Sequence, residues 1–272
     1  MSIEFNFKGK NVFVVGGTSG INFGIACGFA RWGANVMVAS RKQEKVDVAV
    51  AELQSLGAKA SGVALDVRDF EQVEAGFEKA SSFFGGPIDV LISGAAGNFL
   101  AKVNDMSANA IRSVVEIDLL GTFHVMKASF DHLKKPGASV INISAPQGYI
   151  PMSHQAHVCS AKAGVDMVTR SLTIEWGKEG VRVNSIVPGP IADTEGMKRL
   201  APTPEIDDIV TRSVPLQRQG DVDDIAYAAA MLSAEQSSYI TGTVLPVDGG
   251  WSQGGAGVVM AKLSHALEKM GK

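Results

Sequence analysis

Short runs of apolar, mostly β-branched residues alternate with longer amphipathic stretches along the 272-residue chain. The runs predict strands at residues 11–15, 35–39, 60–65, 88–92, 139–143, 181–186 and 243–247. Helical periodicity marks most of the intervening stretches. Strands that are apolar along their whole length belong in a parallel sheet that helices cover on both faces. The pattern therefore predicts an α/β fold with a doubly wound, seven-stranded parallel sheet.

The alternation runs without a linker or a low-complexity stretch, so residues 1–272 are predicted to form a single domain of the Rossmann type. Residues 191–214 break the rhythm, because Pro202 and Pro204 stand within a mixed helical pattern. We interpret this segment as an insertion that covers a ligand site. The alternative is an ordinary surface connection.

Composition and charge exclude several classes of function. The 25 basic and 28 acidic residues nearly cancel and form no long basic run, so neither nucleic acid nor a membrane is expected as a partner. Residues 1–10 lack the apolar core of a signal peptide. Cys27 and Cys159 lie in apolar helical patterns, which indicates buried thiols in a reducing compartment. His154 and His157 have no third ligand at a suitable spacing, so no metal site is expected.

A glycine-rich turn follows the first predicted strand and leads into a helix. Such a turn lets backbone N–H groups approach a pyrophosphate at the positive end of the helix. The order of strand, turn and helix, with the next strand ending about 20 residues later, is typical of dinucleotide binding. The residues predicted to bind the phosphates are Gly16, Thr18, Ser19, Gly20 and Ile21.

The second predicted strand leads into Ser40 and Arg41, with no carboxylate to bind a free ribose 2′-hydroxyl. An arginine suits a 2′-phosphate, so the sequence favours NADP(H) over NAD(H) as cofactor. Arg41 could instead be a solvated residue near a helix start. Asp66 and Val67 follow the third strand, where the adenine amino group would bind, although Asp66 could equally cap a helix.

Further motifs stand at residues 142–144 (Asn-Ile-Ser), 188–191 (Pro-Gly-Pro-Ile), 239–242 (Tyr-Ile-Thr-Gly) and 247–250 (Val-Asp-Gly-Gly). With the glycine-rich turn, they resemble the short-chain dehydrogenase/reductase family from about Gly9 to Gly250. This resemblance implies cofactor contacts, with the nicotinamide carboxamide near Ile191 and the phosphates near a hydroxyl. The cofactor-binding residues that it adds are Ala95, Lys162, Pro188, Gly189, Ile191 and Thr194.

Two catalytic hydroxyls of that family are missing here. Val158 stands one helical turn before Lys162, where the family has a tyrosine that exchanges a proton with a substrate oxygen, and valine cannot do so. Ala145 replaces the catalytic serine, and Asp118 replaces the active-site asparagine. This combination, with the motifs at residues 95–100, 121–123 and 175–177, resembles the 2,4-dienoyl-CoA reductases, most closely the peroxisomal type.

The chemistry of that branch accounts for the missing hydroxyls, because its reduction sends a hydride to the far end of a diene and a proton to carbon. The site must stabilise a dienolate oxygen and supply the proton. The resemblance implies that Lys162 holds the nicotinamide ribose and lends positive charge. Asp118 would need a pKa about three units above its ordinary value to act directly as an acid, and Lys162 opposes such a rise. We therefore expect an ionised Asp118 that orients a proton-delivering water.

Asp166, one turn after Lys162, could complete a water-linked relay or form a structural ion pair with the lysine. Asn98 and Phe99 follow the fourth strand, where they could hold the thioester and the acyl chain or simply pack the loop. His157 is a candidate substrate contact or a helix-start residue. Tyr149 is the one nearby phenol and an alternative proton donor.

The predicted function is NADPH-dependent reduction of 2,4-dienoyl-CoA to 3-enoyl-CoA in unsaturated fatty acid breakdown. One alternative is a reductase of another enoyl or 3-oxoacyl thioester. The other is a non-catalytic NADP(H)-binding regulator, although the retained lysine argues against it. Because residues 270–272 are not a Ser-Lys-Leu-like peroxisomal signal, we expect a cytoplasmic enzyme.

The sequence also bears on the oligomeric state and on the C-terminal tail. The resemblance implies a homotetramer, and the helix predicted at residues 155–177 carries an apolar stripe that one sheet face need not absorb, at Val165, Val168, Leu172 and Trp176. Residues 252–272 form a tail that could dock near the acyl site or fray. Its apolar residues recur at helical spacing, at Val259, Leu263, Leu267 and Met270.

Overall fold

Seven parallel strands form one sheet in the computed structural model, which describes residues 5–201 and 203–269. The order β3-β2-β1-β4-β5-β6-β7 confirms the predicted doubly wound sheet. The direction of winding reverses between β1 and β4, which is where such sheets bind ligands. The strands are β1 (Asn11–Val15), β2 (Asn35–Ser40), β3 (Ala60–Ala64), β4 (Val90–Ser93), β5 (Ser139–Ile143), β6 (Arg182–Pro188) and β7 (Val244–Val247).

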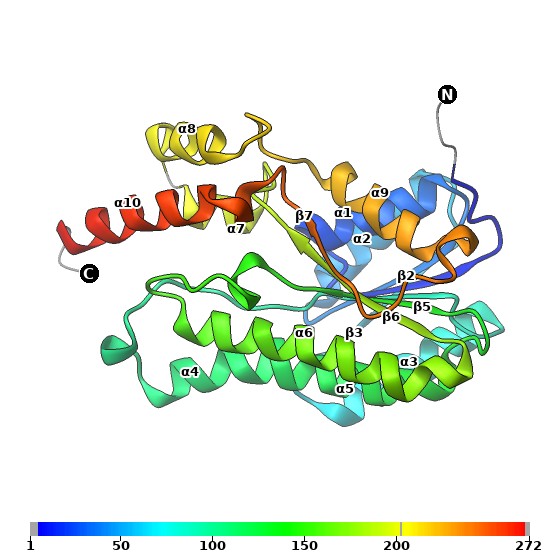
Figure 1. Ribbon diagram of the computed structural model, residues 1–272. Helices are drawn as coiled ribbons and strands as arrows, with labels where there is room; N and C mark the ends of the chain where they lie inside the picture. Colours follow the sequence, from blue (N-terminus) through cyan, green and yellow to red (C-terminus); the bar gives the residue numbers. More distant parts are fainter. Residues whose placement is uncertain (1–4, 202, 270–272) are drawn as a thin grey trace.

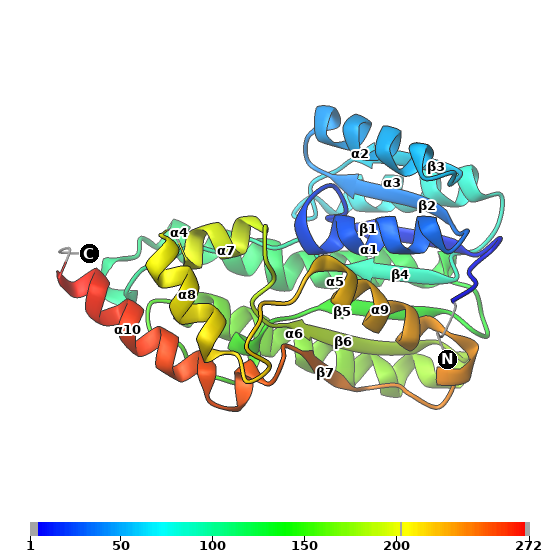
Figure 2. The ribbon, with the colours of Figure 1, turned by 90° about the horizontal axis from the view of Figure 1, so that it is seen from above.

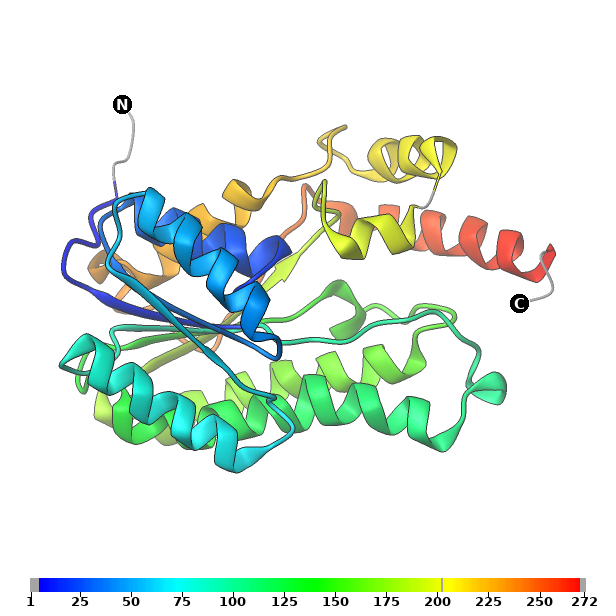
Figure 3. The same ribbon diagram turned by 180° about the vertical axis from the view of Figure 1, so that it is seen from behind.

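Helices cover both faces of this sheet (Figures 1 and 3). One face carries α1, α2 and α9, and the other carries α3, α5 and α6. The helices of the two layers and their partners are α1 (Gly20–Arg31), α2 (Gln43–Ser55), α3 (Phe70–Phe84), α4 (Ala108–Val114), α5 (Gly121–Ser129), α6 (Ala156–Trp176) and α9 (Val222–Ser233).

Alternation along each strand builds the two layers of core. In β1, Val12 and Val14 pack into the cluster beneath α1 and α9, whereas Phe13 and Val15 pack into the cluster beneath α3 and α6. Successive side chains of a strand point to opposite faces, so a strand that is apolar throughout satisfies both layers. All five residues of β1 are buried.

Three helices lie beyond the carboxyl end of the sheet (Figure 2). The segment at residues 191–214 forms α7 (Glu195–Leu200) and α8 (Pro204–Ser213), and the tail forms α10 (Gly255–Lys269). They share an apolar cluster, to which α10 contributes Val259 and Leu263. The side chain of Leu267 and the whole of Met270 lie outside the described residues.

The predicted apolar stripe of α6 packs against the core of its own subunit. We had expected part of it to need a second subunit. Val165, Val168 and Trp176 are buried, and Leu172 packs against the same core. The helix packs on β5 and β6 and also contacts α4 and residues 115–120, so this face has enough partners within the subunit. Its exposed apolar residues are instead Met167 and Ile174, which are 56% and 84% exposed.

Candidate active site

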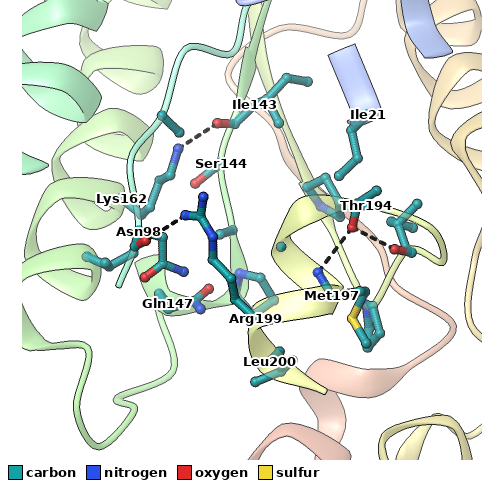
Figure 4. A pocket seen from close by; sticks show the side chains of 18 of the residues that line it. Ile21, Asn98, Ile143, Ser144, Gln147, Lys162, Thr194, Met197, Arg199 and Leu200 are labelled. Atoms are coloured by element: carbon teal, nitrogen blue, oxygen red, sulfur yellow. Dashed lines mark hydrogen bonds between the residues drawn. The ribbon is translucent and has the colours of Figure 1, made fainter. Parts of the chain in front are cut away.

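A cavity of about 660 Å³ opens at the carboxyl edge of the sheet, below α7 (Figure 4). Because all seven strands are parallel, the loops after β1, β4, β5 and β6 meet at this edge. A smaller cavity of about 270 Å³ lies beside it, and Asn22, Gly94 and Ala96 line both. The two together form a continuous site for a ligand in several parts.

The glycine-rich turn provides an open cradle at the start of α1. Gly16 has φ +83°, and a Cβ there would lie 2.8 Å from the Ala95 nitrogen, so only glycine fits. At Gly20, with φ +56°, a Cβ would instead meet only Thr194, at 4.0 Å. Ser19 is the N-cap of α1, yet its side chain makes no capping hydrogen bond. The open space at Gly20, the uncapped N-terminus of α1 and the Ser19 hydroxyl together fit the pyrophosphate of a dinucleotide.

The smaller cavity has the features of an adenosine subsite. Thr18 and Ser19 line it from the turn, and the sequence-predicted residues that join them are Ser40, Arg41, Asp66, Val67 and Ala95. The Ser40 hydroxyl is buried and has no hydrogen-bond partner among the described residues. Lys42 and Lys45, which sequence reasoning missed, also line this cavity and add to the positive charge beside Arg41.

Asp66 is already engaged at the edge of this subsite. Its Oδ1 accepts hydrogen bonds from the backbone nitrogen and the Nε of Arg68, each at 3.0 Å. The hydrogen bonds from the Arg68 guanidinium lower the pKa of the Asp66 carboxyl. Asp66 therefore stays ionised, and Arg68 is its partner within the chain.

The loop after β6 forms the opposite wall, where the resemblance implies the nicotinamide. Pro188, Gly189 and Ile191 line the larger cavity. A Cβ at Gly189 would lie 2.6 Å from the Cα of Asp248, so the loop passes too close to β7 for any other residue. The Thr194 hydroxyl caps α7 by accepting from the Met197 nitrogen at 3.2 Å and donates to the Ile191 carbonyl at 2.8 Å.

Asp118 and Lys162 form a buried ion pair at the base of the larger cavity. Lys162 Nζ lies 3.5 Å from Asp118 Oδ2 and donates to the Ile143 carbonyl at 3.0 Å. Asp118 Oδ1 accepts from the Gly97 nitrogen at 2.7 Å. Asp118 lies in a π-helical segment, Val115–Leu120, between α4 and α5, a distortion that is frequent at functional sites. The Lys162 side chain is 7% exposed and the Asp118 side chain 1% exposed. Because water is excluded from both, each charge is stabilised mainly by the other.

Burial raises the pKa of the Asp118 carboxyl above its ordinary value. The Lys162 ammonium, the Gly97 N–H and His157 oppose that rise without cancelling it. The direction is opposite to the one expected from Lys162 alone, because the sequence does not show how completely the π-helical segment removes Asp118 from water. The carboxyl therefore takes up a proton more readily than an exposed aspartate.

Asp166 lies behind the cavity wall rather than in it. It is 2% exposed, and a Cβ at Gly148 would lie 2.6 Å from its Oδ2. Burial raises the pKa of its carboxyl, and the neighbouring Ser144 and Ser185 hydroxyls oppose that rise. Ser144 lines the cavity, and its buried hydroxyl lies beside the Asp166 carboxyl. Among the described residues Lys162 pairs with Asp118 and not with Asp166.

The remaining sequence candidates divide into cavity residues and supports. Asn98 and Phe99 line the cavity, as does Val158 in the place of the family tyrosine. His157 lies behind Phe99, with the ring centroids 4.4 Å apart, and burial lowers its pKa. Tyr149 is 46% exposed and is not among the residues that line the cavity, so it is poorly placed as a proton donor.

Three polar residues at the mouth of the cavity escaped sequence reasoning. Gln147 and Gln155 line it between β5 and α6, and Arg199 reaches it from α7. Gln147 lies in the loop after β5, which ends at Ile143 near the active site, and that position was the only available signal. Nothing local in the sequence marked Gln155 or Arg199.

The described residues contain no group of three or more His, Cys, Asp or Glu side chains that could hold a metal ion. No helix within them is long and apolar enough to cross a membrane.

Comparisons with known proteins agree with this geometry. A family model described as enoyl-(acyl carrier protein) reductase matches residues 15–252. The peroxisomal 2,4-dienoyl-CoA reductase ((3E)-enoyl-CoA-producing) of Danio rerio is 43% identical over 88% of this chain and 80% of its own. A Bacillus subtilis relative, "Probable 2,4-dienoyl-CoA reductase ((2E)-enoyl-CoA-producing)", is 35% identical over 89% and 96%.

A solved structure extends the comparison to three dimensions. The short chain dehydrogenase from Bacillus anthracis superimposes with a TM-score of 0.79 at 36% identity, covering 90% of this chain and 97% of that one. Fold, cofactor cradle and sequence therefore agree. The chain belongs to the short-chain dehydrogenase/reductase family, on the branch that contains the 2,4-dienoyl-CoA reductases.

Proposed function

We propose that this enzyme uses NADPH to reduce 2,4-dienoyl-CoA thioesters to 3-enoyl-CoA in the breakdown of unsaturated fatty acids. One observation carries the proposal: a buried Lys162–Asp118 pair faces a cavity in which Val158 replaces the catalytic hydroxyl. Such a site can donate a proton toward carbon and stabilise negative charge, but it has no phenol for a carbonyl reduction. The names of the relatives support the same substrate class.

When bound, NADPH supplies a hydride to the far end of the diene. The chain would hold it through the turn at Gly16 and Gly20, through Thr194, and through Lys162 at the ribose. Positive charge on Lys162 also stabilises the negative charge that moves onto the thioester oxygen. Asn98 lies at the cavity mouth, where its amide could donate to that oxygen, and Phe99 would pack against the acyl group.

Asp118 governs the proton in this proposal. Its carboxylate orients a water that protonates the substrate carbon next to the thioester, and the double bond then lies between carbons 3 and 4. Asp166 holds a proton more readily than an ordinary aspartate, and Ser144 connects it to the cavity. The two residues could return a proton to the water after each turnover.

A steady-state assay with NADPH tests the function. We expect turnover of short and medium 2,4-dienoyl-CoA substrates, and much slower turnover of the matching 2-enoyl- and 3-oxoacyl-CoA compounds. Faster reduction of either of those would favour the alternative thioester reductase. Stoichiometric NADPH binding without turnover of any acyl-CoA would identify a non-catalytic regulator.

Cofactor choice gives a direct prediction. The unpartnered Ser40 hydroxyl and the cations Arg41, Lys42 and Lys45 surround the expected ribose position. NADPH should therefore bind at least about tenfold more tightly than NADH. Arg41→Asp should erase that preference, because a carboxylate repels a 2′-phosphate and accepts from a 2′-hydroxyl. Fluorescence titration of both nucleotides measures the ratio, and equal affinities in the unmutated enzyme would refute the assignment.

We also propose a homotetramer in the cytoplasm. Apolar residues are exposed on the outer side of the α5–α6 layer, where a second subunit would cover them: Leu120, Phe123, Met167 and Ile174. Both cysteines are free thiols, with Cys27 buried and Cys159 half-buried.

The helices beyond the sheet are proposed to cover the acyl chain. Met197 and Trp251 belong both to the cavity wall and to the apolar cluster that α10 completes. Truncation after Gly254 should raise KM for a long-chain dienoyl-CoA by at least about fivefold, with little change for a short chain, because apolar contact with the chain is lost. Sedimentation should still show a tetramer, since the α5–α6 face is untouched. Unchanged KM for both substrates would leave α10 without this role.

A further inference from the structure

We propose that Gln155 is a positioning residue, which turns the side-chain amide of Asn98 so that its N–H group donates to the thioester oxygen of the substrate. The inference rests on the proposed function, because it assigns the hydrogen-bond donor for that reaction. Gln155 does not carry out chemistry itself. It selects which end of the Asn98 amide faces the cavity.

Three amide side chains form a continuous line at the cavity mouth. Gln147 Nε2 donates to Gln155 Oε1 at 3.0 Å, and Gln155 Nε2 donates to Asn98 Oδ1 at 3.2 Å. All three line the cavity, yet they come from the loop after β4, the loop after β5 and the residue before α6. The line therefore links the three segments that surround the thioester position.

Both hydrogen bonds of this line are donated in the same direction, from Gln147 toward Asn98. The line therefore ends in a free amide N–H donor at Asn98 and a free amide oxygen acceptor at Gln147. Because Asn98 Oδ1 is occupied, its Nδ2 is the free end, and none of the described residues accepts from it. At the other end, Gln147 Oε1 is buried and accepts from no group in the described part of the chain. An oxygen that gains negative charge needs donors, so the Asn98 end suits the thioester and the Gln147 end does not.

The surroundings hold Asn98 in place for this role. Arg199 donates from α7 to the backbone carbonyl of Asn98 at 3.0 Å (Figure 4). In the same loop, the Ala101 nitrogen donates to the backbone carbonyl of His154 at 2.9 Å. Gln155 is 3% exposed, so water cannot readily replace its hydrogen bonds. The loop is fixed by its backbone, and only the amide orientation is left for Gln155 to decide.

Gln155→Glu tests the assignment, because an ionised carboxylate has the same shape but only accepts. It would receive the Asn98 N–H group and turn Oδ1 toward the substrate. We expect kcat for a dienoyl-CoA to fall at least about tenfold with a smaller change in KM, since the bond strengthens as charge develops. NADPH affinity and melting temperature should stay close to those of the unmutated enzyme. Gln253→Glu, at an exposed glutamine outside the cavity, is the matched control.

A double-mutant cycle distinguishes orientation from general damage. Asn98→Ala alone should lower kcat by about tenfold or more, and adding Gln155→Glu should then lower it no further. Gln155→Met, which neither donates nor accepts, should show the same dependence on Asn98 if the glutamate variant proves unstable. Additive losses, or full activity in stable Gln155→Glu enzyme, would overturn the inference. Failure of the unmutated enzyme to reduce dienoyl-CoA would instead overturn the proposed function.

Discussion

Asp118→Asn is expected to lower turnover of a 2,4-dienoyl-CoA by about a hundredfold or more, the scale of a lost proton-transfer group. The amide keeps an oxygen for the Gly97 N–H group but cannot hold the negative charge that orients a water. The fold should survive, because asparagine has nearly the same volume and removes a buried charge. NADPH affinity should also survive, because Lys162, the proposed ribose contact, keeps its hydrogen bond to the Ile143 carbonyl.

Single-turnover measurements with saturating NADPH separate this loss from binding. Asp131→Asn, at an aspartate whose side chain is 94% exposed, is the matched control. In the unmutated enzyme kcat should fall as pH decreases through the raised pKa of Asp118, because protonation removes the carboxylate. That acidic limb should disappear in the variant. Asp118→Asn enzyme that keeps the original rate would contradict the assignment.

Val158→Tyr is an informative companion to this variant. It restores the phenol that the family usually carries, in a position where Val158 is 2% exposed. Because the proposed proton goes to carbon, the tyrosine should not rescue Asp118→Asn. Recovery of activity would mean that the proton path ends on the substrate oxygen.

Lys162→Met should have the largest effect, a loss of about a thousandfold in kcat/KM for the dienoyl-CoA. The ammonium holds the ribose and the charged oxygen in the proposed site, and a thioether can do neither. NADPH should bind more weakly as well, which Asp118→Asn should not show. Lys178→Met, at an exposed lysine beyond α6, controls for loss of a surface charge. Turnover close to that of the unmutated enzyme would exclude Lys162 from the mechanism.

The same variant has a signature in stability. Without the ammonium 3.5 Å away, the pKa of the Asp118 carboxyl in the folded state rises further above its ordinary value. The folded state then binds more protons than the unfolded state above about pH 4. The free energy of unfolding therefore decreases as pH rises through this window, more steeply than in the unmutated enzyme. Thermal melts at pH 5 and pH 8 measure the difference, and a parallel pH dependence in both enzymes would contradict it.

The sheet was predictable because each strand repeats one unambiguous signal. Strands such as β1 and β5 are buried on both faces, and their short, mostly apolar runs predicted both ends to the residue. The exceptions lie where apolar residues continue past the ladder. Ile88 was predicted to begin the fourth strand, but it forms an isolated bridge with Leu133 before β4 begins at Val90. An apolar pattern in the sequence shows which residues are buried. Where a strand begins depends on its hydrogen bonds to the neighbouring strand, which the pattern does not show.

The site was predictable where the chemistry is tied to a position in the fold. Most of the predicted cofactor residues line one of the two cavities, because a glycine-rich turn and strand ends are fixed by the topology. Lys162 and Asp118 were identified from their family positions, and the structure brings them together. The upward shift in the pKa of Asp118 was not foreseen, since it depends on a π-helical distortion that residue type does not reveal.

Contacts between distant segments stayed beyond the sequence. Gln155 and Asn98 are far apart in the chain, and Arg199 reaches Asn98 from α7. Glutamine, asparagine and arginine are ordinary residue types for loops and helix ends. These three residues form one site only because α7 and the start of α6 pack against the loop after β4.

In the proposed reaction the site places a hydride and a proton on two different carbons of the diene. The most direct test is NMR analysis of the product formed from a medium-chain 2,4-dienoyl-CoA with NADPH deuterated at the transferred position in deuterium-free water. We expect 3-enoyl-CoA with deuterium on carbon 5 and a solvent-derived hydrogen on carbon 2. Deuterium on carbon 3, or reduction confined to 3-oxoacyl thioesters, would contradict it.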